Sequence, residues 1–123
     1  MLNEYTTAIA TDGSGAATVY LGSRIRGMIL AIRYTPSAIA TGATLTITAD
    51  GSGQAVLTKA NAGTSVAWYY PVAPANKVAD GAASSLSEVP LWLYQDRLKL
   101  VVASGGATKA GSITLWVDEP VGG

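Results

Sequence analysis

The sequence contains no cysteine, no histidine and no phenylalanine among its 123 residues. The absence of cysteine excludes disulfides and thiolate metal sites, and the absence of histidine excludes a Ser-His-Asp triad and imidazole ligands. The eight acidic residues offer no pair whose spacing indicates the shared catalytic cleft that a glycosidase needs. We therefore predict a protein that is not an enzyme and that uses no metal and no cofactor.

An excess of one charge and a long apolar run are also missing. The formal net charge is zero and the cations are scattered, with only Arg24 and Arg26 close together, so the chain lacks the basic stripe of a nucleic-acid binder. The longest aliphatic run, 28–32, is far shorter than the ~20 residues that span a bilayer. Residues 1–10 have no basic region of the kind that opens a secretory signal. We expect no nucleic-acid partner and no membrane contact.

The dominant pattern is short-range alternation of apolar and polar residues, which predicts strands. Such segments occupy 4–10, 16–21, 27–35, 44–48, 55–58, 65–70, 91–95, 98–102 and 112–118, with Gly- or Pro-containing turns at 11–15, 22–24, 36–42, 50–54, 60–64 and 104–111. The length predicts a single domain over 1–123. We predict an all-β, antiparallel β-sandwich or jelly-roll-like fold with eight or nine short strands. The predicted core comprises Leu45, Ile47, Leu100, Val102, Ile113 and Leu115.

The strand 27–35, "GMILAIRYT", carries apolar residues on both faces. Met28, Leu30, Ile32 and Tyr34 form one face, and Ile29 and Ala31 lie on the other beside Arg33. We therefore predict that this strand is buried on both sides for part of its length.

The sequence Asp-Gly-Ser-Gly occurs twice, in "TDGSG" (11–15) and in "ADGSG" (49–53). A metal loop, a phosphate cradle and a tight turn between strands are the alternatives. A calcium loop requires several oxygen ligands, whereas each copy has one carboxylate, and neither copy precedes a helix. Asp-Gly is a strong hairpin signal because glycine accepts a positive φ. Two tight turns are predicted.

The stretch 71–90, "PVAPANKVADGAASSLSEVP", holds three of the five prolines and no aromatic residue. It reads as a long loop, which is either a crossover between sheets or an arm that contacts a partner. Its one helix signal is a capping-box match over 85–88, where at most one turn could form before Pro90. Residues 119–123, "EPVGG", are predicted to form a C-terminal tail.

The large aromatic residues indicate a surface for a partner. Three of them are consecutive, so at least one must point away from the core of a strand. The others alternate with aliphatic residues that are predicted to point inward. Large exposed aromatic side chains favour an interface, whereas a covering loop or a second inner face would bury them. The candidate interface residues are Trp68, Tyr69, Tyr70, Trp92, Tyr94 and Trp116.

Three long phrases of the chain resemble small structural proteins of tailed bacteriophages. They are "NEYTTAIATDGSG", "LTITADGSGQAVLTKANAGTS" and "DRLKLVVASGGATKAGSITLWV", and the resemblance extends over about residues 3–118, with 71–90 the least similar part. Members are often encoded among the head genes near the major capsid protein. The resemblance implies a virion protein, assembled in the host cytoplasm, whose partner is the major capsid protein. The ending "DEPVGG" extends beyond the usual end of the last strand.

Two classes of function follow. The first is a capsid decoration or cement protein that stabilises the shell through protein–protein contacts. It would act as a homo-oligomer, and a trimer would match a local three-fold axis of a shell. The second is a glycan- or receptor-binding β-sandwich displayed on the particle. Within the first class, a head–tail connector or a tail component is a further alternative.

Overall fold

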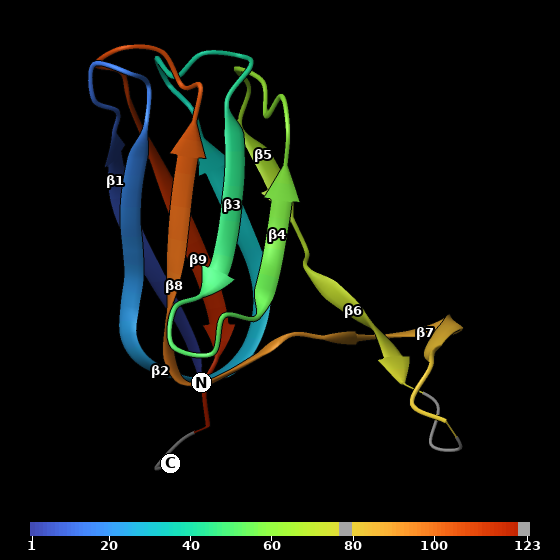
Figure 1. The fold of residues 1–123 in the computed structure, drawn as a ribbon. Coiled ribbons are helices and arrows are strands. Elements are labelled where there is room, and N and C mark those ends of the chain that lie inside the picture. Colours follow the sequence, from blue (N-terminus) through green and yellow to red (C-terminus); the bar gives the residue numbers. More distant parts are fainter. Residues whose placement is uncertain (77–79, 121–123) are drawn as a thin grey trace.

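The computed structural model describes residues 1–76 and 80–120 and contains nine strands (Figure 1). The strands are β1 (Leu2–Ala10), β2 (Ala17–Thr35), β3 (Thr44–Ala49), β4 (Ala55–Lys59), β5 (Ala67–Tyr69), β6 (Val72–Asn76), β7 (Ala83–Pro90), β8 (Trp92–Ala103) and β9 (Ala110–Asp118). Within the two described ranges there is no helix, and every strand pair is antiparallel. The prediction of an all-β, antiparallel fold is confirmed.

Seven strands form one open sheet that doubles over along β2 (Figure 1). The first part of β2 pairs with β8, which pairs in turn with β3, and β3 pairs with β4. The second part of β2 pairs with β9 on one side and with β5 on the other, and β9 pairs with β1. Two layers therefore face each other, and their strand orders are β2-β8-β3-β4 and β5-β2-β9-β1.

The bend of β2 lies where the sequence predicts a turn at 22–24. The predicted turn was wrong, because the chain bends there without leaving the strand, and β2 runs from Ala17 to Thr35. Its register with β8 shifts between Leu21 and Ile25, and Gly22 adopts φ 72°. A bulge of this type bends a strand without ending it. At Gly27 a Cβ atom would lie 2.4 Å from the backbone oxygen of Asp118, so only glycine permits this close crossing of β2 and β9.

The predicted core is confirmed, because all six of its members are fully buried between the layers. They come from β3, β8 and β9, and Ile32 and Tyr34 of β2 join the same cluster. Leu30 departs from the pattern and is 38% exposed. The register of β2 with β9 shifts between Ile29 and Ala31, so Leu30 is the extra residue of a bulge and turns away from the core.

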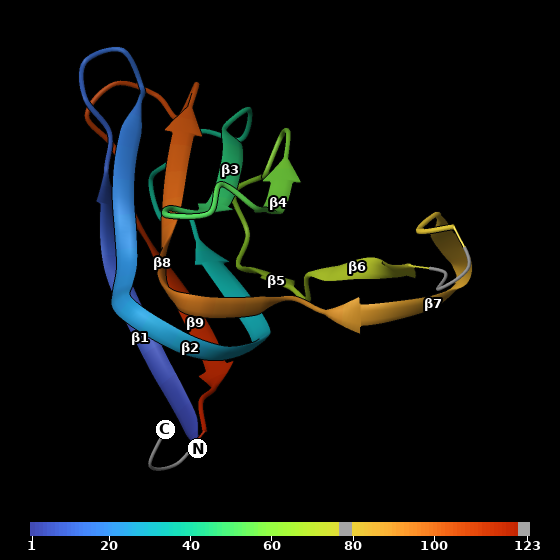
Figure 2. The ribbon, with the colours of Figure 1, turned by 60° about the horizontal axis from the view of Figure 1, so that its bottom comes forward.

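Residues 71–90 were predicted to be irregular, and in the structure most of them form a β-hairpin. β6 and β7 pair with each other as a separate two-stranded sheet, which we call the arm. The arm projects from one end of the doubled sheet (Figure 2). The backbone of the predicted capping box at 85–88 lies within β7, so the helix prediction was wrong. Proline is tolerated in this sheet because both of its strands are edges.

The first Asp-Gly-Ser-Gly stretch is a tight turn between β1 and β2, as predicted. The Asp12 carboxylate accepts hydrogen bonds from the Ser14 amide at 2.9 Å, the Ser14 hydroxyl at 2.7 Å and the Ala16 amide at 3.1 Å. These short-range bonds are typical of an Asx-type turn.

The second stretch is also a turn, between β3 and β4, but a different carboxylate caps it. Asp96 of β8 accepts hydrogen bonds from the amides of Gly51 at 2.8 Å and Ser52 at 3.0 Å. Asp50 instead pairs with the Nε of Arg97 at 2.8 Å. This copy therefore fastens the β3–β4 turn to β8 through a side chain of β8. The first copy is closed by its own Asp12 carboxylate and contacts the β8–β9 loop through backbone hydrogen bonds, from the Thr108 amide to the Asp12 carbonyl at 3.0 Å and from the Gly105 amide to the Gly15 carbonyl at 2.9 Å.

Candidate binding surface

Two of the predicted interface residues meet on the outer face of the β5-β2-β9-β1 layer. The rings of Trp68 and Trp116 stack with centroids 5.0 Å apart and planes 22° apart. The guanidinium of Arg33 lies 5.5 Å from the Trp68 centroid and 5.3 Å from that of Trp116. Trp68 is 47% exposed, and Trp116 is half-buried beneath it. We call Trp68, Trp116 and Arg33 the tryptophan stack.

The stack is a rigid feature. Aromatic stacking contributes ~0.5–1.5 kcal/mol beyond area burial, and a cation over a ring adds ~0.5–1 kcal/mol at an exposed site. The Nε atom of Arg33 is buried and has no hydrogen-bond partner among the described residues. The positive charge of Arg33 is therefore stabilised by the faces of the two tryptophans.

Tyr69 and Tyr70 diverge from each other, as neighbours on an extended chain must. Tyr69 is half-buried and packs against the core cluster, so it does not belong to an outward surface and that part of the site prediction is corrected. Tyr70 follows β5 and is 67% exposed. The consecutive aromatic residues thus divide between the two faces of the layer.

Trp92 and Tyr94 point outward at the start of β8, as predicted, while Leu91 and Leu93 beside them are buried. They line a groove of about 320 Å³ where the arm leaves the body. We call it the arm-root groove, and its remaining lining residues are Gln54, Ala73, Pro74, Asn76, Val89, Pro90 and Leu91. Tyr94 is 75% exposed. Seven of the nine lining residues are apolar or aromatic, although polar atoms make up about half of the exposed lining, and nothing in the described part of the chain covers the groove.

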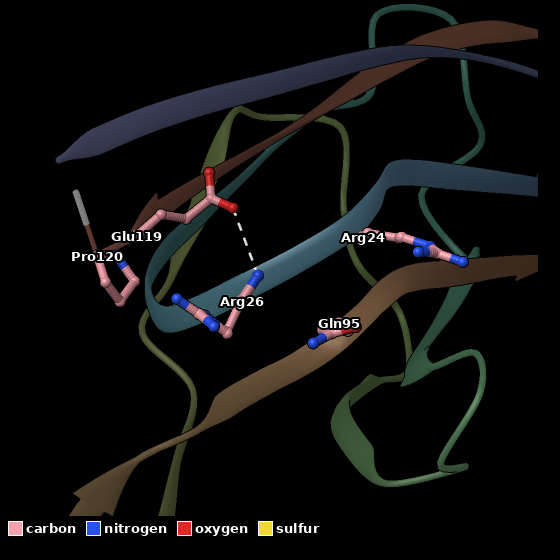
Figure 3. A pocket seen from close by; sticks show the side chains of 5 residues that line it. All are labelled: Arg24, Arg26, Gln95, Glu119 and Pro120. Atoms are coloured by element: carbon pink, nitrogen blue, oxygen red, sulfur yellow. Dashed lines mark hydrogen bonds between the residues drawn. The ribbon is translucent and has the colours of Figure 1, made fainter. Parts of the chain in front are cut away.

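A second concavity of about 250 Å³ lies at the bend of β2 (Figure 3). Arg24, Arg26, Gln95, Glu119 and Pro120 line it, and we call it the arginine trough. The side chains of Arg24 and Arg26 run toward opposite ends of the trough, with Gln95 between them (Figure 3). Gln95 adopts φ 56° and is the extra residue between the pairs Ile25–Asp96 and Arg26–Tyr94.

Glu119 lines the trough and anchors the chain just after β9. Its Oε2 accepts hydrogen bonds from the Tyr5 hydroxyl at 2.6 Å and from the Asn3 amide, and its Oε1 accepts one from the Arg26 backbone at 3.4 Å. The predicted tail therefore begins one residue too early. Pro120 is described and exposed, whereas residues 121–123 lie outside the described residues.

The pKa values of Glu119 and Tyr5 shift in opposite directions, as expected for an acceptor and its donor. Burial alone would raise the pKa of Glu119, but the hydrogen bonds from Tyr5, Asn3 and the Arg26 amide lower it below its ordinary value of 4.5. Burial, reinforced by the bond to Glu119 and by its charge, raises the pKa of Tyr5 to about 12. Both shifts favour a charged Glu119 beside a neutral Tyr5 at neutral pH.

Glu119→Gln is expected to lower the melting temperature at pH 7 by roughly 3 °C, since charge-assisted hydrogen bonds are replaced by neutral ones worth ~1 kcal/mol less. The lowered pKa of the folded protein means that the carboxylate stabilises the fold above pH 4.5 and that this stability is lost as the pH falls through the folded-state value. Melting curves from pH 7 to pH 3 should therefore converge for the two proteins. The control Glu4→Gln, at an exposed carboxylate of β1, should have the same melting temperature as the wild type at every pH. A difference in melting temperature between Glu119→Gln and the wild type that stays constant from pH 7 to pH 3 would contradict the account.

The sequence indicated the aromatic residues as candidates, but it did not indicate that Arg33 lies over two of their rings or that Arg24 and Arg26 line a concavity. Arg33 was assigned only to a strand face, and Arg24 and Arg26 were noted only for their proximity. Within residues 1–76 and 80–120, no group of three or more His, Cys, Asp or Glu side chains is placed to hold a metal ion. No helix in that described part of the chain is long and apolar enough to cross a membrane.

Three surface features are therefore candidates for binding, namely the tryptophan stack, the arm-root groove and the arginine trough. Their exposed side chains are mainly aromatic, aliphatic and cationic. Comparison with protein-family models, with curated proteins and with solved structures finds no match to this chain.

Proposed function

We propose that this chain is a non-enzymatic structural protein of a tailed-bacteriophage virion, a capsid decoration or cement protein that binds the major capsid protein. The observation that carries the proposal is the arm together with the uncovered groove at its root, where Trp92 and Tyr94 are exposed. An isolated two-stranded hairpin is marginally stable in water, so a protein that extends one gains most when the hairpin packs on another surface. We place the chain in the virion, after assembly in the host cytoplasm.

We further propose that the doubled sheet is a jelly-roll sandwich. Support comes from the two strand orders, because β2 crosses from one layer to the other. The chain also changes layer between β1 and β2, β2 and β3, β4 and β5, β5 and β8, and β8 and β9. Double-sheet jelly rolls occur in viral capsid proteins and in lectins. In this interpretation the arm is an insertion between two strands of an otherwise compact sandwich.

A cement protein stabilises a shell when it binds the assembled lattice more tightly than the dissociated subunits. The repeating lattice also lets many weak contacts act together, provided that the bound protein is itself oligomeric. We therefore propose a homo-oligomer, with a trimer as the form that fits a local three-fold axis. Because the formal net charge is zero, long-range electrostatic attraction to the shell is weak. We therefore propose that the specificity for the capsid protein comes from short-range contacts.

A second candidate function is glycan or receptor binding from the surface of the particle. The tryptophan stack favours it, because an exposed ring of Trp68 held against Trp116 presents a flat apolar platform beside the charge of Arg33. The stack lies on the outer face of one layer, whereas the arm-root groove lies at its end, so the two functions use different residues and can be separated by mutation.

The experiment is sedimentation of the purified protein with shells assembled from the major capsid protein of the same genome. We expect the wild type to pellet with intact shells and to remain in the supernatant with dissociated capsid protein. Tyr94→Ala should reduce shell binding by roughly tenfold or more, as for an exposed aromatic contact, without changing the circular dichroism spectrum. Trp68→Ala is the comparison, because loss of binding to a glycan array in that variant, with no shell binding by the wild type, would support the second candidate and contradict the first.

A further inference from the structure

The arm and the body carry complementary charges that form no ion pair among the described residues. Arg24 and Arg26 line the arginine trough and form no ion pair with any described residue. Glu88 of β7 is exposed and also forms none. The other acids near the trough or on the arm are engaged, because Glu119 is bound by Tyr5 and Asn3, and the carboxylate of Asp80 accepts a hydrogen bond within its own turn.

A molecule cannot bring its own arm to its own trough. Tyr94 pairs with Arg26 at the start of β8, and roughly 20 Å of extended chain separates Tyr94 from Glu88. Over that length β7 leads away from the body (Figure 2). The arginines and Glu88 can therefore meet only between molecules.

The arm itself needs a second surface. In its described part the side chains alternate between exposed and half-buried along β6, and Val72 and Val89 are among the exposed apolar residues. Among the described residues β6 pairs with no strand other than β7, so its outer edge is not covered by a further strand. A hairpin of this kind gains both burial and order by lying against a neighbour.

We propose that the arm of one copy lies across the arginine trough of a second copy, where Glu88 pairs with Arg24 or Arg26. The inference rests on the homo-oligomer of the proposed function and names its contact. Each copy donates one arm and receives one, so the contact is head-to-tail and closes into a ring or, for two copies, into a reciprocal exchange. The carboxylate of the trough itself, Glu119, is held by Tyr5, Asn3 and the Arg26 backbone, so the neighbouring copy supplies the carboxylate that pairs with the arginine side chains.

The test uses the isolated protein without shells, so that its outcome is independent of capsid binding. Analytical ultracentrifugation should show an oligomer for the wild type. We expect the dissociation constant of the oligomer to rise at least tenfold in either of two variants. One combines Arg24→Glu with Arg26→Glu, and the other carries Glu88→Arg alone. The three substitutions together should restore association, because the pairs are re-formed with exchanged charges. The control is Lys59→Glu combined with Lys109→Glu, which changes the net charge as much as the double arginine variant does but at exposed residues elsewhere. It should leave the oligomer unchanged.

A second measurement holds even where a charge variant folds poorly. The natural chain has no cysteine, so a chain with Glu88→Cys and Arg26→Cys, or with Glu88→Cys and Arg24→Cys, can form a disulfide across the proposed contact only between copies. Mild oxidation should give covalent dimers and larger species for one of these pairs. The control with Glu88→Cys and Lys109→Cys should give no more covalent dimer than random collision produces. The inference would be overturned if the wild type is monomeric at all concentrations. It would also be overturned if the dissociation constant of the oligomer does not change when Arg24, Arg26 and Glu88 are substituted. Shell binding by such a monomer would leave the proposed function standing, whereas an arm-linked oligomer that ignores shells would contradict only that function.

Discussion

Replacing residues 74–88 with Asn-Gly is expected to abolish binding to capsid shells while the body of the protein stays folded. The truncation is geometrically simple because Ala73 and Val89 are paired across the base of the arm, and Asn-Gly is a favoured two-residue hairpin turn. Both paired residues are retained, and Ala73, which packs against the core, keeps its contact. We expect a loss of shell affinity of roughly 100-fold or more, because the truncation removes Pro74 and Asn76 from the arm-root groove and breaks the proposed link between copies, and with it the avidity of the oligomer.

Circular dichroism and thermal melting provide the control for this truncation. The arm contributes little to the core, so the melting temperature of the isolated body should change by only a few degrees. A truncated protein that melts like the wild type and still pellets with shells at full strength would exclude the arm as the contact. The tryptophan stack would then be the next surface to alter.

Leu100→Ala is expected to reduce the free energy of unfolding by ~2–5 kcal/mol. Leu100 lies at the centre of β8, opposite Val19 on β2 and opposite Ile47 on β3, and it is fully buried between the layers. Neighbours on both sides are held by the sheet, so the cavity left by the truncated side chain cannot collapse. Denaturant unfolding monitored by tryptophan fluorescence measures the loss.

Leu30→Ala removes the same atoms from the bulge of β2 and is the matched control. Leu30 is 38% exposed, so its truncation should cost less than about 1 kcal/mol. A loss below about 0.5 kcal/mol for Leu100→Ala would contradict the two-layer packing, and a larger loss for Leu30→Ala than for Leu100→Ala would show that the bulge has been placed on the wrong face.

The core could be predicted from the sequence because alternation records which face of a strand is buried. Ile113 and Leu115, for example, lie on the same face of β9 and are both buried, as their spacing requires. The turn at 11–15 could also be predicted, because the Asp12 carboxylate bonds residues 14 and 16 beside it in the chain. These features depend on local chemistry that the sequence states directly.

The bends within strands could not be predicted, because they depend on long-range pairing. Gly22 looks like the glycine of a turn, and only the register between β2 and β8 shows that the chain bends and continues. In the same way Leu30 follows the period of its neighbours in the sequence but is displaced by a bulge opposite β9. A period of two cannot reveal an inserted residue until the partner strand is known.

The arm and the arginine trough were missed for related reasons. Prolines at 71, 74 and 90 and the many alanines hide the alternation of β6 and β7, so the stretch reads as a loop. The trough joins Arg24 and Arg26 of β2 with Gln95 of β8 and Glu119 after β9, which are far apart in the sequence. No local signal connects these residues, and their proximity follows from the way that the sheet doubles over.

The measurement that tests the central claim most directly is a density map of the intact virion at a resolution that shows strands. The account predicts the doubled sheet on the head shell, at positions that repeat with the capsid lattice, with the arm extending from the body onto a neighbouring copy and the arm-root groove facing capsid protein. Density for this chain at the neck or tail, or single copies on the shell whose arms contact nothing, would contradict it.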